Sequence, residues 1–190
     1  MDSPWGRLSL RAIRRPPSAD SPLPWSCPTR ARHGGGQVWL PGSYDPETDL
    51  YIFGTGNPTP GYTGAGRKGD NLFTCALVAV NVDTGKMAWY FQTSPHDMHD
   101  YDSAQTPVLV DGMFQGKMRK LVLTAARNGY FFVLDRVTGE HLLTTKYGTH
   151  TNWAKGLNQH GGPKFDPAKN ATVPGALVSP DSGGTVNWQP

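Results

Sequence analysis

The sequence predicts an all-β protein built as part of a β-propeller, and three observations point there. The chain of 190 residues has 23 glycines, 17 prolines and 11% aromatic residues, a composition typical of turn-rich sheet proteins. Short apolar runs alternate with turn residues, and none shows the spacing of an amphipathic helix over three turns. A strand–turn–strand pattern that begins at Ala79 also recurs at Val133.

The first 33 residues differ in composition from the rest of the chain. They hold six arginines and two acidic residues, a sum of +4, so the remaining 157 residues sum to −1 of the total +3. No apolar stretch of the length of a signal-peptide core follows the basic residues. We expect this segment to be disordered or not native to the protein. A nucleic-acid-binding function would depend wholly on it and is not favoured, since the rest of the chain is not basic.

The expected strands follow in order from residue 34. Val38–Leu40 and Leu50–Thr55 flank a turn at residues 44–49, where Pro46 and the aspartates supply turn chemistry. Runs of β-forming residues then predict five more strands: Leu77–Val82, Met87–Gln92, Pro107–Val110, Lys120–Ala125 and Gly129–Leu134. No run reaches the roughly 18 apolar residues of a membrane-spanning helix, so we expect no membrane span.

The internal repeat predicts the same hairpin twice. An Asn or Asp caps the turn, a Gly permits a positive φ, and an apolar residue after the turn packs on the neighbouring unit. These positions are Asn81, Gly85 and Trp89 in the first copy, and Asp135, Gly139 and Leu143 in the second. Repeats of about 40–50 residues with four short strands are typical of propeller blades, although two unrelated hairpins would give the same pattern.

The two cysteines, Cys27 and Cys75, form no CxxC motif. Cys75 stands in the apolar run 74–80, so we expect it to be buried in a strand rather than reactive.

Residues 95–102 form an unusual acidic loop after the strand Met87–Gln92. Three aspartates and two histidines lie within seven positions. A solvated loop is the ordinary interpretation. In extended backbone, however, Asp100 and Asp102 would point the same way, and a hard cation with oxygen ligands would relieve their repulsion. A zinc site at His96-x-x-His99 ranks lower, because neither a helix nor a third soft ligand is evident.

Three glycine-containing motifs could approach a ligand closely. Gly34–Gly36 precede Trp39, the run 54–57 ends in Asn57, and Arg127 opens an Arg-Asn-Gly turn. Each also has an ordinary interpretation: a loop before a core tryptophan, an Asn-Pro turn and a surface hairpin.

Taken together, four segments resemble the pyrroloquinoline quinone (PQQ)-dependent alcohol dehydrogenases, or quinoproteins, of the methanol and ethanol dehydrogenase family. They are residues 34–39, 41–60, 69–103 and 119–140, and the likeness runs from about Gly34 to the C-terminus. The resemblance implies an eight-bladed propeller that holds PQQ and a metal ion on its axis. Residues 34–190 would then be a fragment with about two to three of the eight blades.

The resemblance also implies roles for six residues. Asn57 matches the amide ligand of the metal, and Asp100 matches the aspartate that is both a metal ligand and the base on the substrate hydroxyl. Asp102 matches the extra aspartate of the lanthanide-using branch, which calcium-using members usually lack. Toward PQQ, Trp39 matches the floor beneath the ring, Arg127 matches the donor to the quinone oxygens, and Asn187 matches a later polar contact.

The implied function is oxidation of an alcohol to an aldehyde by hydride transfer to PQQ, assisted by Ca²⁺ or a lanthanide ion. Family members work in the periplasm and pass electrons to a cytochrome c. The metal-ligating Glu and the vicinal disulfide of the family have no counterpart in this chain. We therefore expect the isolated chain to bind PQQ poorly, to oxidise no alcohol and to aggregate through unpaired blade surfaces.

A non-catalytic propeller scaffold is the alternative function. It would share the blade repeat but would have no reason to hold the set Asn57, Asp100, Asp102 and Arg127.

Overall fold

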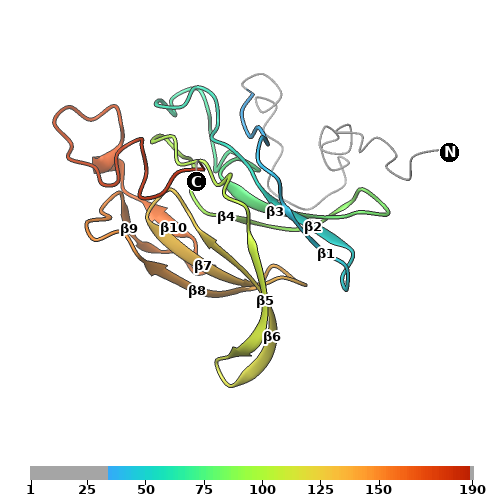
Figure 1. Cartoon of the computed structure of the whole chain (residues 1–190). Coiled ribbons are helices and arrows are strands. Elements are labelled where there is room, and N and C mark those ends of the chain that lie inside the picture. The colour runs from blue at the N-terminus through green and yellow to red at the C-terminus, as the bar shows by residue number, and fades with distance from the viewer. Residues whose placement is uncertain (1–33, 189–190) are drawn as a thin grey trace.

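The computed structural model describes residues 34–188, and its regular structure is almost entirely β-sheet (Figure 1). The first sheet contains β1 (Ser43–Asp45), β2 (Leu50–Gly54), β3 (Ala76–Asn81) and β4 (Met87–Gln92). The second contains β5 (Val108–Phe114), β6 (Lys117–Ala125), β7 (Tyr130–Asp135) and β8 (His141–Lys146). A hairpin of β9 (Ala154–Leu157) and β10 (Pro163–Phe165) follows, and then a short 3-10 helix, Pro167–Lys169. The all-β prediction is confirmed.

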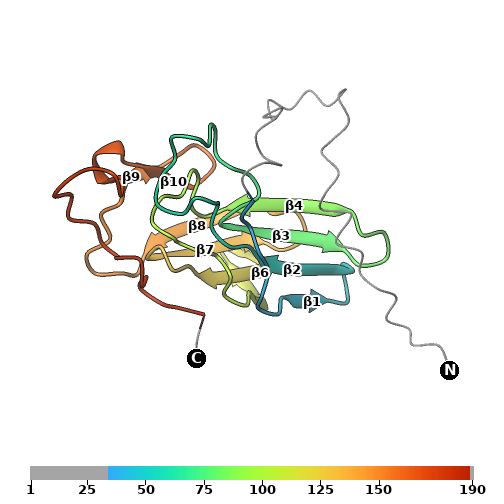
Figure 2. The same cartoon turned by 90° about the horizontal axis from the view of Figure 1, so that it is seen from above.

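Each large sheet is an antiparallel meander of four strands in sequence order, which is the construction of a propeller blade. Figure 2 shows the two sheets against each other, with the β9–β10 hairpin beyond one end. In such a meander alternate strands run the same way, so β2 and β4 end at one edge of the first sheet. The loops that follow even-numbered strands are therefore the ones that gather on one face of the molecule.

One strand prediction and one turn prediction need correction. Val38–Leu40 is not a strand: the glycine segment before it lies beside residues 56–58, where Gly36 N donates to Asn57 O at 2.9 Å. The strand that pairs with β2 is instead β1, whose last two residues fall inside the turn expected at residues 44–49. Asp45 ends β1 and caps the remaining turn, since its carboxylate accepts from Glu47 N at 3.2 Å and Thr48 Oγ1 at 2.6 Å. The strands β9 and β10 were not predicted.

The internal repeat forms the same hairpin twice, down to its bulge. Ala79 pairs with Trp89 and Val133 with Leu143, and in both hairpins the register shifts at the next residue. The caps also match, because Asn81 Oδ1 accepts from Thr84 N at 2.9 Å and Asp135 Oδ1 accepts from Thr138 N at 3.0 Å. The hairpin geometry is thus set by the local sequence.

Two side chains join the first sheet to the second. Trp89 of β4 donates its indole N–H to Arg136 O at 3.0 Å and lies so close to Gly139 that a Cβ there would be 2.8 Å from the ring. The guanidinium of Arg136 bridges the sheets through Asp45 of β1 at 2.8 Å and Asp111 of β5 at 2.5 Å. Both Arg136 and Asp45 are buried. The predicted packing on a neighbouring unit is therefore confirmed for Trp89.

The core lies between the two sheets and below the loops that follow β4 and β6. Thirteen buried residues form it: Leu50, Ile52, Leu77, Ala79, Trp89, Phe91, Tyr101, Val122, Ala126, Tyr130, Phe132, Leu134 and Trp153.

Cys75 is fully buried, as expected, but it precedes β3 and has a φ of +45°. Burial raises the pKa of its thiol well above the usual value, which favours the inert thiol form. The predictions for Cys27 and for residues 1–33 concern positions outside the described residues. Within residues 34–188 no helix has the length and apolar character needed to cross a membrane.

Candidate functional site

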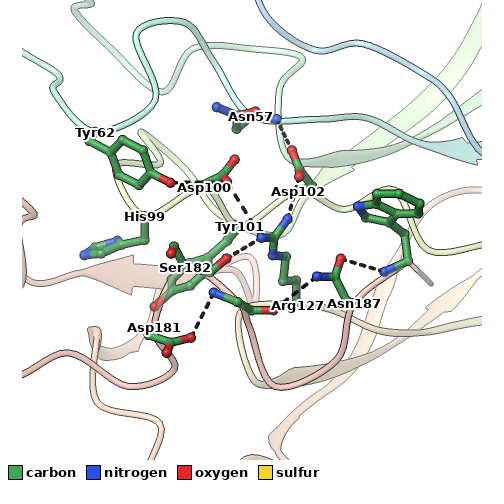
Figure 3. Close-up of polar contacts among 12 residues, drawn as sticks. Asn57, Tyr62, His99, Asp100, Tyr101, Asp102, Arg127, Asp181, Ser182 and Asn187 are labelled. Carbon is green, nitrogen blue, oxygen red and sulfur yellow. Dashed lines mark hydrogen bonds and ion pairs between the residues drawn. The ribbon is translucent and has the colours of Figure 1, made fainter. Parts of the chain in front are cut away.

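Three loops on one face bring together four of the six predicted site residues (Figure 3). Asn57 follows β2, Asp100 and Asp102 lie in the loop after β4, and Arg127 follows β6. Within the first sheet the meander places the ends of β2 and β4 on the same side, and contacts after β4 and β6 bring the end of β6 to them. Contacts then connect the four in a chain from Asn57 through Asp102 and Arg127 to Asp100.

Asp102 and Arg127 form a buried ion pair at the centre of this chain. Arg127 Nη1 is 2.8 Å from Asp102 Oδ2, and the other carboxylate oxygen accepts from Asn57 N at 2.7 Å. Burial raises the pKa of Asp102, while the donors Asn57 N and Arg127 oppose that rise and Asp100 adds to it by charge repulsion. Each carboxylate oxygen thus accepts from one protein donor and keeps a second lone pair for a cation.

Asp100 is the more accessible carboxylate of the pair. Its backbone is not extended, as the alternation argument assumed, but left-handed, with φ at +66°. Its Oδ2 lies 3.7 Å from Arg127 Nη2 and accepts from the hydroxyl of Tyr62 at 3.4 Å. The side chain is 29% exposed, so it can meet a molecule that enters from the loop face.

The turn of Arg127 is anchored by its neighbour Asn128, which is fully buried. The Asn128 amide donates to Thr93 O at 2.9 Å and Ser94 Oγ at 3.0 Å, both directly after β4. These two bonds hold the guanidinium of Arg127, which follows β6 of the second sheet, beside the acidic loop that follows the first sheet. Sequence reasoning gave Asn128 no role, because its burial and its partners after β4 are not visible in the local sequence.

Tyr101 and His99 point into the core instead of toward the site. Tyr101 donates its hydroxyl to Pro180 O, and His99 stacks on its ring with centroids 5.0 Å apart. Tyr101 therefore has a packing role in the core. A nitrogen of His99 bonds Lys169 O at 2.7 Å and one of His96 bonds Gly69 O at 2.7 Å, so the two rings have separate partners.

The zinc alternative receives no support from this arrangement. In the part of the chain that the structure describes, no three His, Cys, Asp or Glu side chains are grouped so as to hold a metal ion. The predicted cation ligands are different in kind: two carboxylates and one amide, a set of oxygen donors suited to a hard cation.

Trp39 reaches the site and Asn187 lies at its margin. Gly56 separates the indole of Trp39 from Asp102: a Cβ on Gly56 would be 2.7 Å from the ring and 3.1 Å from Asp102 Oδ1. Trp39 is 40% exposed, and its edge contacts Trp188 with centroids 6.3 Å apart. Asn187 bonds within its own turn, to Gly183 O at 3.5 Å and Trp188 N at 2.8 Å.

Polar groups left without partners show where a further molecule could bind. Among residues 34–188, Arg127 Nε is buried without a hydrogen-bond partner, although Nη2 of the same side chain donates to Ser182 O. The Asn57 amide uses its nitrogen to bond Pro58 O at 3.0 Å, which leaves its oxygen available as a ligand. A cationic donor, two carboxylates, an amide oxygen and an exposed indole therefore fit both a hard cation and a flat anionic ring.

One more carboxylate belongs to this loop, although sequence reasoning gave it no role. Asp97 is buried, and its oxygens accept from three successive backbone N–H groups: His99 at 3.3 Å, Asp100 at 3.0 Å and Tyr101 at 3.2 Å. Burial raises the pKa of Asp97 to about 7, against the opposing effect of these three donors.

Comparison with known families places the chain among the quinoproteins. The family described as "Glucose/ethanol/alcohol dehydrogenase, beta-propeller domain", abbreviated PQQ, matches residues 14–149. The matched region begins inside the first segment that composition set apart and includes both four-stranded sheets.

Individual relatives agree with this match. The quinoprotein alcohol dehydrogenase PedH of Pseudomonas putida is 39% identical over 164 residues, which is 83% of this chain and 27% of PedH. The lanthanide-dependent methanol dehydrogenase of Methylorubrum extorquens is 35% identical over 190 residues, 94% of this chain and 31% of that protein. The chain thus spans between about a quarter and a third of the length of these relatives.

Solved structures show the same likeness. The quinohemoprotein alcohol dehydrogenase ADHIIG of Pseudomonas putida HK5 superposes with a TM-score of 0.76 at 38% identity, covering 83% of this chain and 24% of that one. A europium-containing methanol dehydrogenase gives a TM-score of 0.76 at 36% identity, covering 83% and 28%.

Proposed function

The chain belongs to the β-propeller family of PQQ-dependent glucose, ethanol and alcohol dehydrogenases, and from this premise we propose that it supplies part of the active site of a quinoprotein alcohol dehydrogenase. The reaction is the oxidation of an alcohol to its aldehyde. The observation that carries the proposal is the contact chain from Asn57 through Asp102 and Arg127 to Asp100, assembled from the loops after β2, β4 and β6.

In this proposal the oxygen donors hold a cation and the cationic and aromatic groups hold the quinone. Asn57, Asp100 and Asp102 are the ligands from this chain for Ca²⁺ or a lanthanide ion. Asp102 adds a second carboxylate to that of Asp100. This suits a trivalent ion, because the added negative charge of the ligands offsets the added positive charge of the metal. Trp39, Arg127 and Asn187 would hold PQQ, which when bound supplies the hydride acceptor.

Asp100 is the base that takes the proton from the substrate hydroxyl. Three features of the structure suit it to this role. Its carboxylate is partly exposed on the loop face, Arg127 Nη2 lies 3.7 Å from it, and its neighbour Asp102 is held in place by Arg127 and Asn57 N. Arg127 would donate hydrogen bonds to the oxygens of bound PQQ and so stabilise negative charge there.

For the whole enzyme we propose a cytochrome c as the electron acceptor and the periplasm as the compartment, which is what the family resemblance implies. The described chain, with its two blades, holds only part of such an enzyme, and we expect it to show no PQQ-dependent alcohol oxidation by itself. Turnover by the purified 190-residue chain would contradict that expectation.

A chimera tests the catalytic proposal directly. Residues 34–188 would replace the aligned stretch of PedH, which supplies the remaining blades. We expect PQQ-dependent alcohol oxidation that falls at least about 100-fold on Asp100→Asn, because the base is lost. Asp135→Asn, in a turn between β7 and β8, is the matched carboxylate control and should retain activity. If a folded chimera binds PQQ and its rate of alcohol oxidation is unchanged by Asp100→Asn, the assignment is wrong.

A further inference from the structure

Asp100 owes its position to an unusual piece of backbone. A left-handed conformation costs a non-glycine residue about 1–2 kcal/mol, and Asp100 adopts it with φ at +66°. Something nearby must hold the loop in this shape. The adjoining residues do not do so through a sheet, because residues 96–102 belong to no strand.

The carboxylate of Asp97 provides the restraint. It is buried and accepts from the backbone N–H groups of three consecutive residues, including Asp100 itself at 3.0 Å. Three successive N–H groups turned toward one anion form a compact nest, and such a nest requires turned rather than extended backbone. The nest therefore sends the side chain of Asp100 toward Arg127 while Tyr101 enters the core.

A buried arginine fixes the nest to the loop that carries Asn57. Arg67 donates to Asp97 O at 2.9 Å and to Thr63 O at 3.2 Å, and it also bonds Asn71 Oδ1. The bonds link the backbone at residue 97 to residues 63–71, which follow Asn57 in the same connection between β2 and β3. The loops of the two proposed ligand groups are thereby held against each other.

We propose that Asp97 is the positioning residue of this site: its carboxylate, bound to the N–H groups of residues 99–101, sets the direction of the Asp100 carboxylate. The inference rests on the proposed function for the role of Asp100. Asp97 itself touches no substrate and acts only through the loop. Positioning partners behind metal ligands typically contribute about 10–100-fold to metal affinity.

The experiment uses the chimera with PedH described above, which supplies the remaining blades, and it has two readouts. Hydrogen exchange at the amides of residues 99–101 reports on the nest, and Tb³⁺ luminescence, sensitised by nearby aromatic residues, reports on the cation ligands. Asp97→Ala should expose the three amides to exchange and weaken Tb³⁺ binding about 10–100-fold. Asp97→Asn retains one acceptor oxygen. It should therefore keep part of the amide protection and part of the Tb³⁺ affinity that Asp97→Ala loses.

Asp135→Ala is the matched control. Asp135 also accepts from three groups in a turn, Val137 N, Thr138 N and Thr138 Oγ1, but it lies away from the site. Its loss should leave Tb³⁺ affinity within about twofold of wild type. A general loss of stability would instead lower the Tb³⁺ affinity of Asp97→Ala and Asp135→Ala alike.

The outcomes separate the two hypotheses. If the amides of residues 99–101 exchange no faster in Asp97→Ala, or if they do and Tb³⁺ affinity stays unchanged, the positioning role is wrong. If Asp100→Asn binds Tb³⁺ as well as wild type does, the proposed cation site fails, and the positioning role falls with it.

Discussion

The two four-stranded sheets contain one hairpin repeated in different surroundings. In the first, Trp89 pairs with Ala79, is 7% exposed and docks on the turn of the second sheet. In the second, Leu143 pairs with Val133 in the same register but is 37% exposed, and no further four-stranded sheet covers it in residues 34–188. The comparison teaches that local sequence builds the blade, whereas its stability depends on the neighbour that covers it.

The largest expected effect comes from the ion cluster between the sheets. Arg136→Met should lower the free energy of unfolding by about 3–5 kcal/mol, because Asp45 is left as a buried charge without its partner. Urea unfolding followed by tryptophan fluorescence measures this. Lys120→Met, which removes the exposed pair with Glu47, is the control and should cost less than about 1 kcal/mol. Equal costs for both would show that the Arg136 bridge does not join the sheets.

Substitution of the equivalent docking residues tests the comparison most directly. Trp89→Leu should cost about 2–3 kcal/mol, because buried ring area and the indole bond to Arg136 O are lost. Leu143→Ala should cost less than about 1 kcal/mol, since its side chain is only partly covered. The same urea unfolding experiment applies to both. A larger effect at Leu143 than at Trp89 would contradict the asymmetry.

The equivalent glycines in the two hairpin turns test the same difference in surroundings. Gly85 and Gly139 have φ of +65° and +75°, so an alanine is strained at either. Gly85→Ala should cost about 1 kcal/mol, because its Cβ meets open space. Gly139→Ala should cost about 1–2 kcal/mol more, because its Cβ displaces the ring of Trp89. In the Trp89→Leu background this difference should shrink, which a double-mutant cycle would reveal.

Acid should produce the smallest effect at this interface. Burial raises the pKa of Asp45, but the hydrogen bonds from Arg136, Thr48 and Glu47 N outweigh it, and the net pKa lies below the usual 3.8. A carboxyl whose pKa is lowered in the folded state stabilises the folded protein above about pH 4. This contribution to the free energy of unfolding is lost as the pH falls through the pKa of the folded state. Stability should therefore decline below about pH 4, with a slope from this group of at most about 1.4 kcal/mol per pH unit. Asp45→Asn should flatten this part of the curve.

The candidate site shows where sequence reasoning was sufficient and where it was not. Asn57, Asp102 and Arg127 were selected from motifs and their order, and the structure brings them into contact. The supporting residues Asp97 and Asn128 were not selected, because their partners are backbone groups and residues of another sheet. The assumption of extended backbone at Asp100 was wrong because Asp97, a buried acceptor three residues earlier, turns the chain.

The sequence by itself determined the sheet-rich class, the repeated hairpin with its caps and bulge, and the residue types of the site. These features depend on interactions between residues close in the chain, which a pattern can reveal. Only the tertiary structure decided which apolar residue is covered, which carboxylate is buried and, through Arg67 that anchors Asp97 from 30 residues away, which way Asp100 faces. Those outcomes depend on contacts such as that of Trp89 with Gly139, between residues distant in sequence, whose distances no local pattern specifies.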